Sequence, residues 1–335
     1  MRRIMLAALA LYLSASAQAQ RTRPIPQIDR ETFIATVDTR VDKTGPMEGH
    51  TVRAIVTAII DTSWTKLEKL RALYMWETKH IAFDCKAYHH PGNYAANASV
   101  ALNERKTTSK GFALFFKAMC DVTGIECYVV EGLLRTEPEE IGKLDNKHRQ
   151  YWNVAVIDDV QYLVDPTLGA GTTDAKMRKF TPNRTDAWWL ANRDLFALSH
   201  YPDKPQWQLL EKPVTRSEFS KAPVITAHAL ALGVLPGHAA TGMLRGREDT
   251  VVYLNYQVQR PYLIKNVKIS IDEGNPVPVE YEMGGSGMTV KVPYTKAGNK
   301  QEYSLYVNDK RTLTYLAQVR PYKRPKPKVI SAAKQ

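Results

Sequence analysis

Apolar positions recur at helical spacing in the stretch that precedes Gly124, a residue type that commonly ends helices. Three or four residues separate the apolar side chains, which would therefore share one face of a helix. These side chains are Phe112, Phe115, Phe116 and Met119. The pattern predicts a buried amphipathic helix in the middle of the chain.

Runs of apolar, β-branched and aromatic residues follow this helix and predict three strands. They are Cys127–Leu134, Tyr151–Ile157 and Val160–Val164. Asp158 and Asp159 separate the last two runs, a length and chemistry suited to a tight hairpin. The central stretch therefore reads as one helix followed by a small antiparallel sheet.

A second helix is predicted upstream, because Thr65 and Glu68 form a capping-box pattern ahead of apolar positions that continue to about Lys79. After Pro223 the pattern changes to strand-like runs separated by turn residues rich in glycine and proline. These runs are Thr250–Gln257, Val267–Ile271, Met288–Val292 and Tyr303–Val307. They predict a small C-terminal β-sandwich.

Three short motifs stand at the corners of the central stretch. They read Ser109-Lys110-Gly111-Phe112-Ala113, Gln150-Tyr151-Trp152-Asn153 and Asp165-Pro166-Thr167-Leu168-Gly169-Ala170-Gly171. Together they resemble the transglutaminase-like family of papain-type proteins, whose patterns are C-x-G-[YF]-A, H-x-W-N and D-P-T-x-G-A-G. Segment 81–84 extends this likeness upstream, and segment 187–210 is similar to the branch related to kyphoscoliosis peptidase.

The resemblance implies an α+β fold, with a transglutaminase-like (papain-like) core of helices packed on an antiparallel sheet and a β-sandwich after it. The expected division is a signal peptide at 1–19, a transglutaminase-like domain at 20–222, an Ig-like β-sandwich at 223–318 and a basic, proline-rich tail at 319–335.

The family triad of Cys, His and Asp corresponds here to Ser109, Gln150 and Asp165. A serine hydroxyl stays protonated near neutral pH and needs a base within hydrogen-bonding reach. The Gln150 amide can donate and accept hydrogen bonds, but it cannot carry a proton between steps. Loss of both groups removes roughly 10⁶-fold of catalysis in a comparable triad enzyme. We therefore predict an inactive triad, in which Ser109 or Thr108 caps the helix and Asp165 anchors a turn.

An active peptidase or acyl transferase is the alternative, with Ser109 or Cys85 as nucleophile and His148 as base. His148 lies two residues before Gln150, so both would face the same side of a strand about 7 Å apart. Trp152 is a further cleft candidate, with a core aromatic as its other interpretation. Cys85 with His89 and His90 could also be read as metal ligands, a weak pattern on one loop. We predict no cofactor and no metal.

Residues 1–20 have the pattern of a secretory signal, with Arg2 and Arg3 before an apolar segment and a small-residue cleavage site near Ala19. We therefore expect a secreted or periplasmic protein, and no later stretch is long enough to span a bilayer. The formal net charge of +12 favours anionic partners in general, with a solvated basic face that has no specific partner as the preferred interpretation of the charge alone. A peptide, protein or anionic cell-envelope ligand is expected, and nucleic acid is not.

Overall fold

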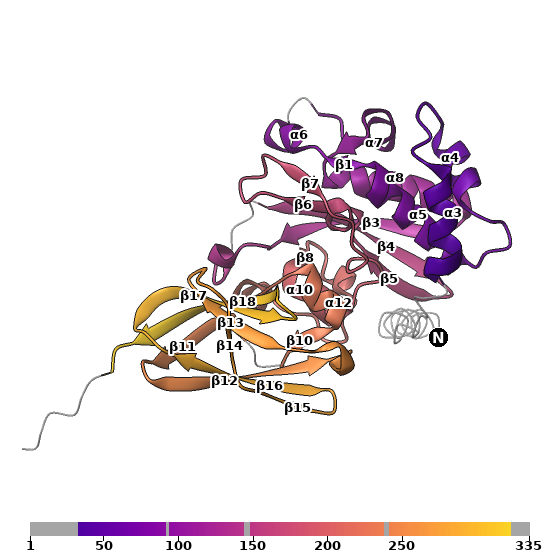
Figure 1. Ribbon diagram of the computed structural model, residues 1–335. Coiled ribbons are helices and arrows are strands. Elements are labelled where there is room, and N and C mark those ends of the chain that lie inside the picture. Colours follow the sequence, from indigo (N-terminus) through magenta and orange to yellow (C-terminus); the bar gives the residue numbers. More distant parts are fainter. Residues whose placement is uncertain (1–32, 92–93, 144–147, 238–240, 323–335) are drawn as a thin grey trace, which may run out of the picture.

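The computed structural model describes residues 33–91, 94–143, 148–237 and 241–322, and the predicted signal peptide lies outside these ranges. Helices gather in the N-terminal half (Figure 1). Its helical segments are η1 (Ile34–Asp38), α3 (Thr39–Thr44), α4 (Val52–Ile59), α5 (Lys66–His80), α6 (Cys85–His89), α7 (Ala98–Glu104), α8 (Ser109–Thr123), η3 (Pro138–Glu140) and α9 (Pro166–Ala170). Those that follow are α10 (Arg193–Ser199), η4 (Pro205–Gln208), α11 (Arg216–Lys221), α12 (Ala227–Leu232) and η5 (Pro261–Leu263).

A four-stranded antiparallel sheet forms the centre of this half, in the order β5-β4-β3-β8. Its strands are β3 (Glu126–Leu134), β4 (Arg149–Ile157), β5 (Val160–Val164) and β8 (His200–Pro202). Two short ribbons flank it, made of β1 (Ala82–Phe83) with β2 (Lys106–Thr107) and β6 (Gly171–Thr173) with β7 (Phe180–Pro182).

The central helix α8 packs on one face of this sheet, against β3 and β4. Its predicted apolar face is buried completely, and Gly124 ends the helix in the left-handed conformation at φ +70°. The Thr65–Glu68 capping box opens α5, which in turn packs on α8. Asp158 and Asp159 both have positive φ, as a two-residue hairpin turn requires. The predicted helices, strands and hairpin of this half are confirmed.

The C-terminal half is a β-sandwich of two sheets. One sheet runs β10-β12-β16-β15, with strands β10 (Val234–Pro236), β12 (Thr250–Val258), β16 (Gly287–Tyr294) and β15 (Tyr281–Gly284). The other runs β11-β18-β17-β13-β14, with β9 also paired to β18. Its strands are β11 (Met243–Arg247), β18 (Lys310–Arg320), β17 (Gly298–Val307), β13 (Val267–Ile271), β14 (Val277–Pro278) and β9 (Val224–Ile225). The predicted α+β class with a C-terminal sandwich is therefore confirmed.

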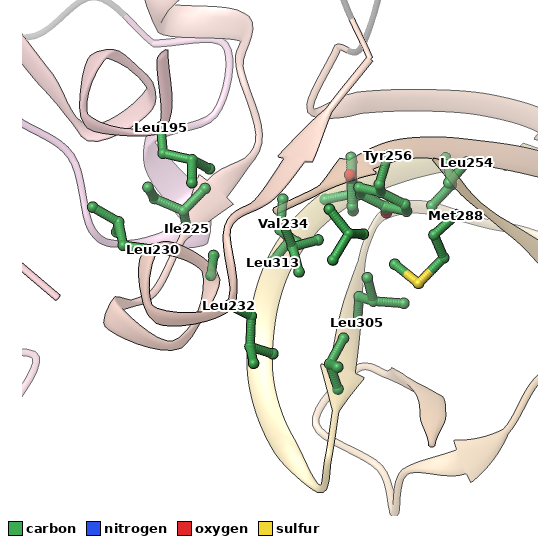
Figure 2. Packing of buried hydrophobic residues seen from close by; sticks show 14 of the residues in the cluster. Leu195, Ile225, Leu230, Leu232, Val234, Leu254, Tyr256, Met288, Leu305 and Leu313 are labelled. Carbon is green, nitrogen blue, oxygen red and sulfur yellow. Dashed lines mark hydrogen bonds between the residues drawn. The ribbon is translucent and has the colours of Figure 1, made fainter. Parts of the chain in front are cut away.

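The two halves share one apolar core, since the side chains on the second face of the central sheet belong to the same buried cluster as the sandwich interior. Figure 2 follows this cluster from Leu195 of α10 through Ile225 and Leu230 to Leu313 and Met288 inside the sandwich. Both faces of the central sheet are consequently covered, and β4 is buried along most of its length. In the described ranges no helix is long and apolar enough to cross a bilayer.

Candidate functional site

Asp165 is the centre of a buried polar cluster between β5 and α9. Its side chain has no exposed surface, and its Oδ1 accepts a hydrogen bond from the Leu168 amide at 3.0 Å, which caps α9. Its Oδ2 accepts a hydrogen bond from Gln150 Nε2 at 2.8 Å. Two of the three family positions therefore meet as the motif predicts, with an amide where the imidazole would stand.

Ser109, the third family position, is the first residue of α8 and is 7% exposed. The N-cap residue is Thr108, and it makes no side-chain capping bond, so neither residue caps the helix as the sequence suggested. Within the described part of the chain, the Ser109 hydroxyl forms no hydrogen bond with Gln150 or Asp165. In this part of the chain, neither of the other two family positions is therefore hydrogen-bonded to the hydroxyl at the nucleophile position.

His200 completes the cluster and was missed from the sequence. It is the first residue of β8, fully buried, and its Nε2 lies 3.1 Å from Asp165 Oδ2. Its Nδ1 lies 2.8 Å from the hydroxyl of Ser199. The Phe196 ring stacks on the imidazole at 3.7 Å, and Trp152 lies edge-on at 5.1 Å. The imidazole is thus held on both nitrogens and on its ring face.

Burial lowers the pKa of His200, although the nearby Asp165 carboxylate opposes this shift. A neutral imidazole has one donor and one acceptor nitrogen. In the neutral form Nε2–H donates to Asp165, and Nδ1 lies beside the Ser199 hydroxyl, which also donates to the Phe196 carbonyl at 3.2 Å. Among the described residues, the hydroxyl beside the His200 ring therefore belongs to the buried Ser199, and neither ring nitrogen forms a hydrogen bond with Ser109.

The motif residues that carry no chemistry keep their packing roles. A Cβ on Gly111 would lie 1.7 Å from Thr107 Oγ1, and one on Gly169 would lie 2.1 Å from the Tyr74 hydroxyl oxygen. Only glycine fits at such separations. The Asn153 amide donates to the Ala113 carbonyl at 2.9 Å, which ties β4 to α8. The frame of the site is therefore intact around altered catalytic positions.

The sequence profile of the transglutaminase-like superfamily matches residues 53–166. The chain carries a transglutaminase-like domain. Kyphoscoliosis peptidase from Mus musculus is 29% identical over 192 residues, which cover 57% of this chain and 29% of that protein. The Homo sapiens protein matches with the same identity and coverage. These relatives support the branch related to kyphoscoliosis peptidase.

Two further comparisons are more distant. Hillarin from Drosophila melanogaster is 22% identical over 213 residues, which cover 58% of this chain and 25% of that protein. A crystal structure of a TGase has 18% sequence identity and a TM-score of 0.27, covering 47% of this chain and 37% of that one. The chain thus spans less than a third of the length of these curated relatives.

His148 of the transglutaminase-like domain pairs with Glu140. Its Nδ1 lies 3.0 Å from Glu140 Oε1, and its side chain is 39% exposed. Burial raises the pKa of Glu140, but the His148 hydrogen bond and backbone amides outweigh it and lower the pKa overall. The structure therefore places His148 on a carboxylate of η3, and not on Ser109 or Asp165.

Cys85 begins the short helix α6, and burial raises the pKa of its thiol. A raised pKa disfavours the thiolate, which is the reactive form. His89 Nε2 lies 3.1 Å from the carbonyls of Lys176 and Met177, and His90 Nδ1 lies 3.1 Å from the Lys86 carbonyl. Across the described ranges, no group of three or more His, Cys, Asp and Glu side chains is arranged to hold a metal ion.

Trp152 has no exposed surface and lies in the core, where its ring contacts Phe196 and His200. The structure thus places it as the core aromatic of the two interpretations, and it offers no surface to a ligand. The exposed rim beside Ser109 is formed by other residues. Lys110 Nζ lies 5.8 Å from the centre of the Tyr151 ring, and Arg149 forms ion pairs with Glu131 and Asp203.

Proposed function

We propose that this protein is a catalytically inactive member of the transglutaminase-like group that binds or scaffolds a peptide, a protein or a cell-envelope ligand. The observation that supports this proposal is the occupation of Asp165 Oδ2. It accepts from the Gln150 amide and from an imidazole whose second nitrogen is already engaged. Among the described residues, no base of this cluster forms a hydrogen bond with the Ser109 hydroxyl, so none is placed to take its proton.

Acyl transfer by a triad requires one group to remove the nucleophile's proton and later return it to the leaving group. Gln150 has no ionisable proton to move in this way. His200 could act only if its hydrogen bond to Ser199 or to Asp165 were broken inside a buried, aromatic-lined pocket. A hydrogen bond lost in such a place costs about 1–3 kcal/mol, because the freed group finds no water.

An active peptidase or acyl transferase that uses Ser109 or Cys85 with His148 would require larger rearrangements of the structure. His148 would have to leave Glu140 and enter the site, and Cys85 would have to ionise although burial raises its thiol pKa. The name peptidase describes the mammalian relatives, of which this chain matches 29% of the length. For this chain we propose binding without turnover.

We infer that the binding surface is the charged rim over the site, formed by Lys110, Tyr151, Arg149, Glu131 and Asp203. Its ionic and aromatic groups are exposed or half-exposed. They suit an extended peptide that offers backbone and charged groups. Export by the N-terminal leader would place this surface outside the cytoplasm, in the secreted or periplasmic location that the leader predicts.

The test is turnover by the purified chain, measured as peptide hydrolysis and as glutamine–amine cross-linking. We expect no activity that Ser109→Ala, Cys85→Ala or His148→Ala removes. Activity that is lost in any of these variants would reject the proposal. As a positive control, Ser109→Cys with Gln150→His rebuilds the family's catalytic pair on an unchanged frame. The thiol introduced in this double variant should react with iodoacetamide faster than the same thiol in Ser109→Cys alone.

A further inference from the structure

A second surface, far from Asp165 in sequence, carries charge that the contacts of the described residues leave unused. It lies where β11 and β18 run side by side and parallel at the edge of the sandwich (Figure 1). Arg245 pairs with Gln318 and Arg247 with Arg320 in the strand register. Alternate residues of a strand face the same side, so these four exposed side chains share one face.

These side chains line a groove of about 810 Å³. Its described lining residues, none of which carries a carboxylate, are Arg245, Gly246, Arg247, Gln318, Arg320 and Pro321.

The three guanidinium groups of this groove form no ion pair or hydrogen bond within the described residues. Arg247 lies over the ring of Tyr322 at 5.3 Å. The nearest acid in sequence, Glu248, is turned toward the backbone amides of Ala297 and Tyr322. The groove therefore keeps its positive charge available to a ligand.

Several arginines elsewhere in the described chain pair with carboxylates. Arg71 pairs with Asp38 and Asp186, and Arg149 pairs with Glu131 and Asp203. Like charges held on adjacent strands repel one another until an anion neutralises them. A planar guanidinium also binds carboxylate, sulfate or phosphate through two parallel hydrogen bonds. The unpaired cluster thus has the chemistry of an anion site.

The spacing of the cluster indicates an extended ligand. Arg245 and Arg247 are two residues apart, about 7 Å along the strand, and Arg320 lies on the next strand, about 5 Å away. Such a row fits repeated anionic groups along a chain better than a single small ion. A groove also fits a chain better than a flat bilayer, and no large aliphatic side chain is among its described lining residues to enter a lipid phase.

Two further features of the sequence and structure suit an extended anionic chain as the ligand. Tyr322, which follows the groove and has Arg247 over its ring, is 44% exposed, and aromatic side chains are of the kind on which the C–H groups of a sugar pack. Past it, the sequence continues with Lys323, Arg324, Lys326 and Lys328, so the cationic character continues beyond the described residues. These residues are not needed for the site itself.

We propose that the β11–β18 groove binds a linear acidic polysaccharide through Arg245, Arg247 and Arg320. This site is separate from the transglutaminase-like domain, and it stands or falls independently of the function proposed above. The arginines neutralise carboxylate or sulfate groups of successive sugars, and binding weakens as salt rises.

The test is the affinity of the full chain for heparin and for polygalacturonate, measured by calorimetry across a salt series. The variant Arg245→Gln/Arg247→Gln/Arg320→Gln should bind on the order of 10- to 100-fold more weakly and with a shallower salt dependence. The matched control is Arg53→Gln/Lys66→Gln/Lys212→Gln, which removes the same charge from exposed positions elsewhere. The affinity of this control variant for the polysaccharides should fall by no more than about threefold.

Two further arms decide the outcome. A chain that ends at Tyr322 removes the tail cations, and it should keep an affinity that still depends on the three arginines. Vesicles of phosphatidylglycerol should bind more weakly than the polysaccharides. The proposal is overturned by an equal loss in both triple variants, by binding that disappears with the tail and ignores the arginines, or by tighter binding to vesicles.

Discussion

The cluster around Asp165 and the groove between β11 and β18 differ in how their polar groups are satisfied. Asp165 is fully buried, and its carboxylate accepts from an amide, an imidazole and a backbone N–H. Arg245 and Arg320 are exposed and have no carboxylate partner in the described chain. The first set is closed by its own contacts, whereas the second leaves its charge to solvent or ligand.

Because of this difference, the family motifs and the charged groups that are available to a ligand lie in different parts of the molecule. The motifs lead to Asp165, yet every strong donor beside it is already used to hold the protein together. Buried polar groups that are fully paired rigidify a fold, while unpaired charged groups on a surface are free to bind. Substitutions in the two regions should therefore differ strongly in their effect on stability.

Replacing Asp165 with alanine should lower the free energy of unfolding by about 4 kcal/mol, because it strands the Gln150 and His200 donors in a dry interior and uncaps α9. Urea denaturation measures this directly. The control Asp194→Ala removes an exposed carboxylate from the start of α10 and should cost less than about 1 kcal/mol. A loss of unfolding free energy in Asp165→Ala no larger than that of the control would contradict the interpretation that the hydrogen bonds of Asp165 stabilise the fold.

Arginine itself offers a matched pair. Arg135 is buried at the junction of the two halves and donates to the carbonyls of Leu198, Ser220 and Pro223. Burial lowers its pKa to about 10. Arg135→Gln should cost about 3 kcal/mol of unfolding free energy in the same urea assay, whereas Arg245→Gln should change it by less than about 0.5 kcal/mol. Similar losses of unfolding free energy in the two variants would contradict the difference between a buried, hydrogen-bonded arginine and an exposed, unpaired one.

The stability should depend on pH through His200. Its pKa is lower in the folded protein than the value of 6.5 typical of an unfolded chain, so the unfolded state binds more protons as the pH falls. The free energy of unfolding should therefore decrease below about pH 6.5, and His200→Gln should flatten this decrease. His80 contributes to the pH dependence in the same direction, because burial lowers its pKa to about 4. Part of the decrease in unfolding free energy at low pH should therefore remain in His200→Gln. An unchanged slope in the variant would count against a neutral, buried His200.

The smallest effect is expected at Ser109. Its hydroxyl forms no hydrogen bond within the described part of the chain, so Ser109→Ala should shift the unfolding free energy by less than about 0.5 kcal/mol. A capping serine would cost about 1 kcal/mol instead. Thermal and urea unfolding of this variant thus separate a free hydroxyl from a structural one.

Local patterns were sufficient for much of the fold. The apolar face of α8, the capping box of α5 and the Asp158–Asp159 turn are each determined by residues close in sequence, and each is confirmed. Gln150 and Asp165 also meet where the motif spacing placed them.

What the sequence did not reveal depends on distant pairing. His200 reaches Asp165 because β8 pairs with β3 across more than sixty positions of sequence. The resemblance of segment 187–210 includes this histidine but gave it no role. The long strand β18 was not predicted, although Leu313, Tyr315, Ala317 and Val319 alternate with mostly polar residues as in a strand with one apolar face. The groove arginines come together only once β11 pairs with that strand.

The most direct test of the central claim is mass spectrometry of the full chain after exposure to a fluorophosphonate, a reagent that labels activated serines. We predict that Ser109 carries no adduct and that the wild type and Ser109→Ala are labelled alike, because no base activates the hydroxyl. A single adduct on the peptide containing Ser109, absent from Ser109→Ala, would contradict the account.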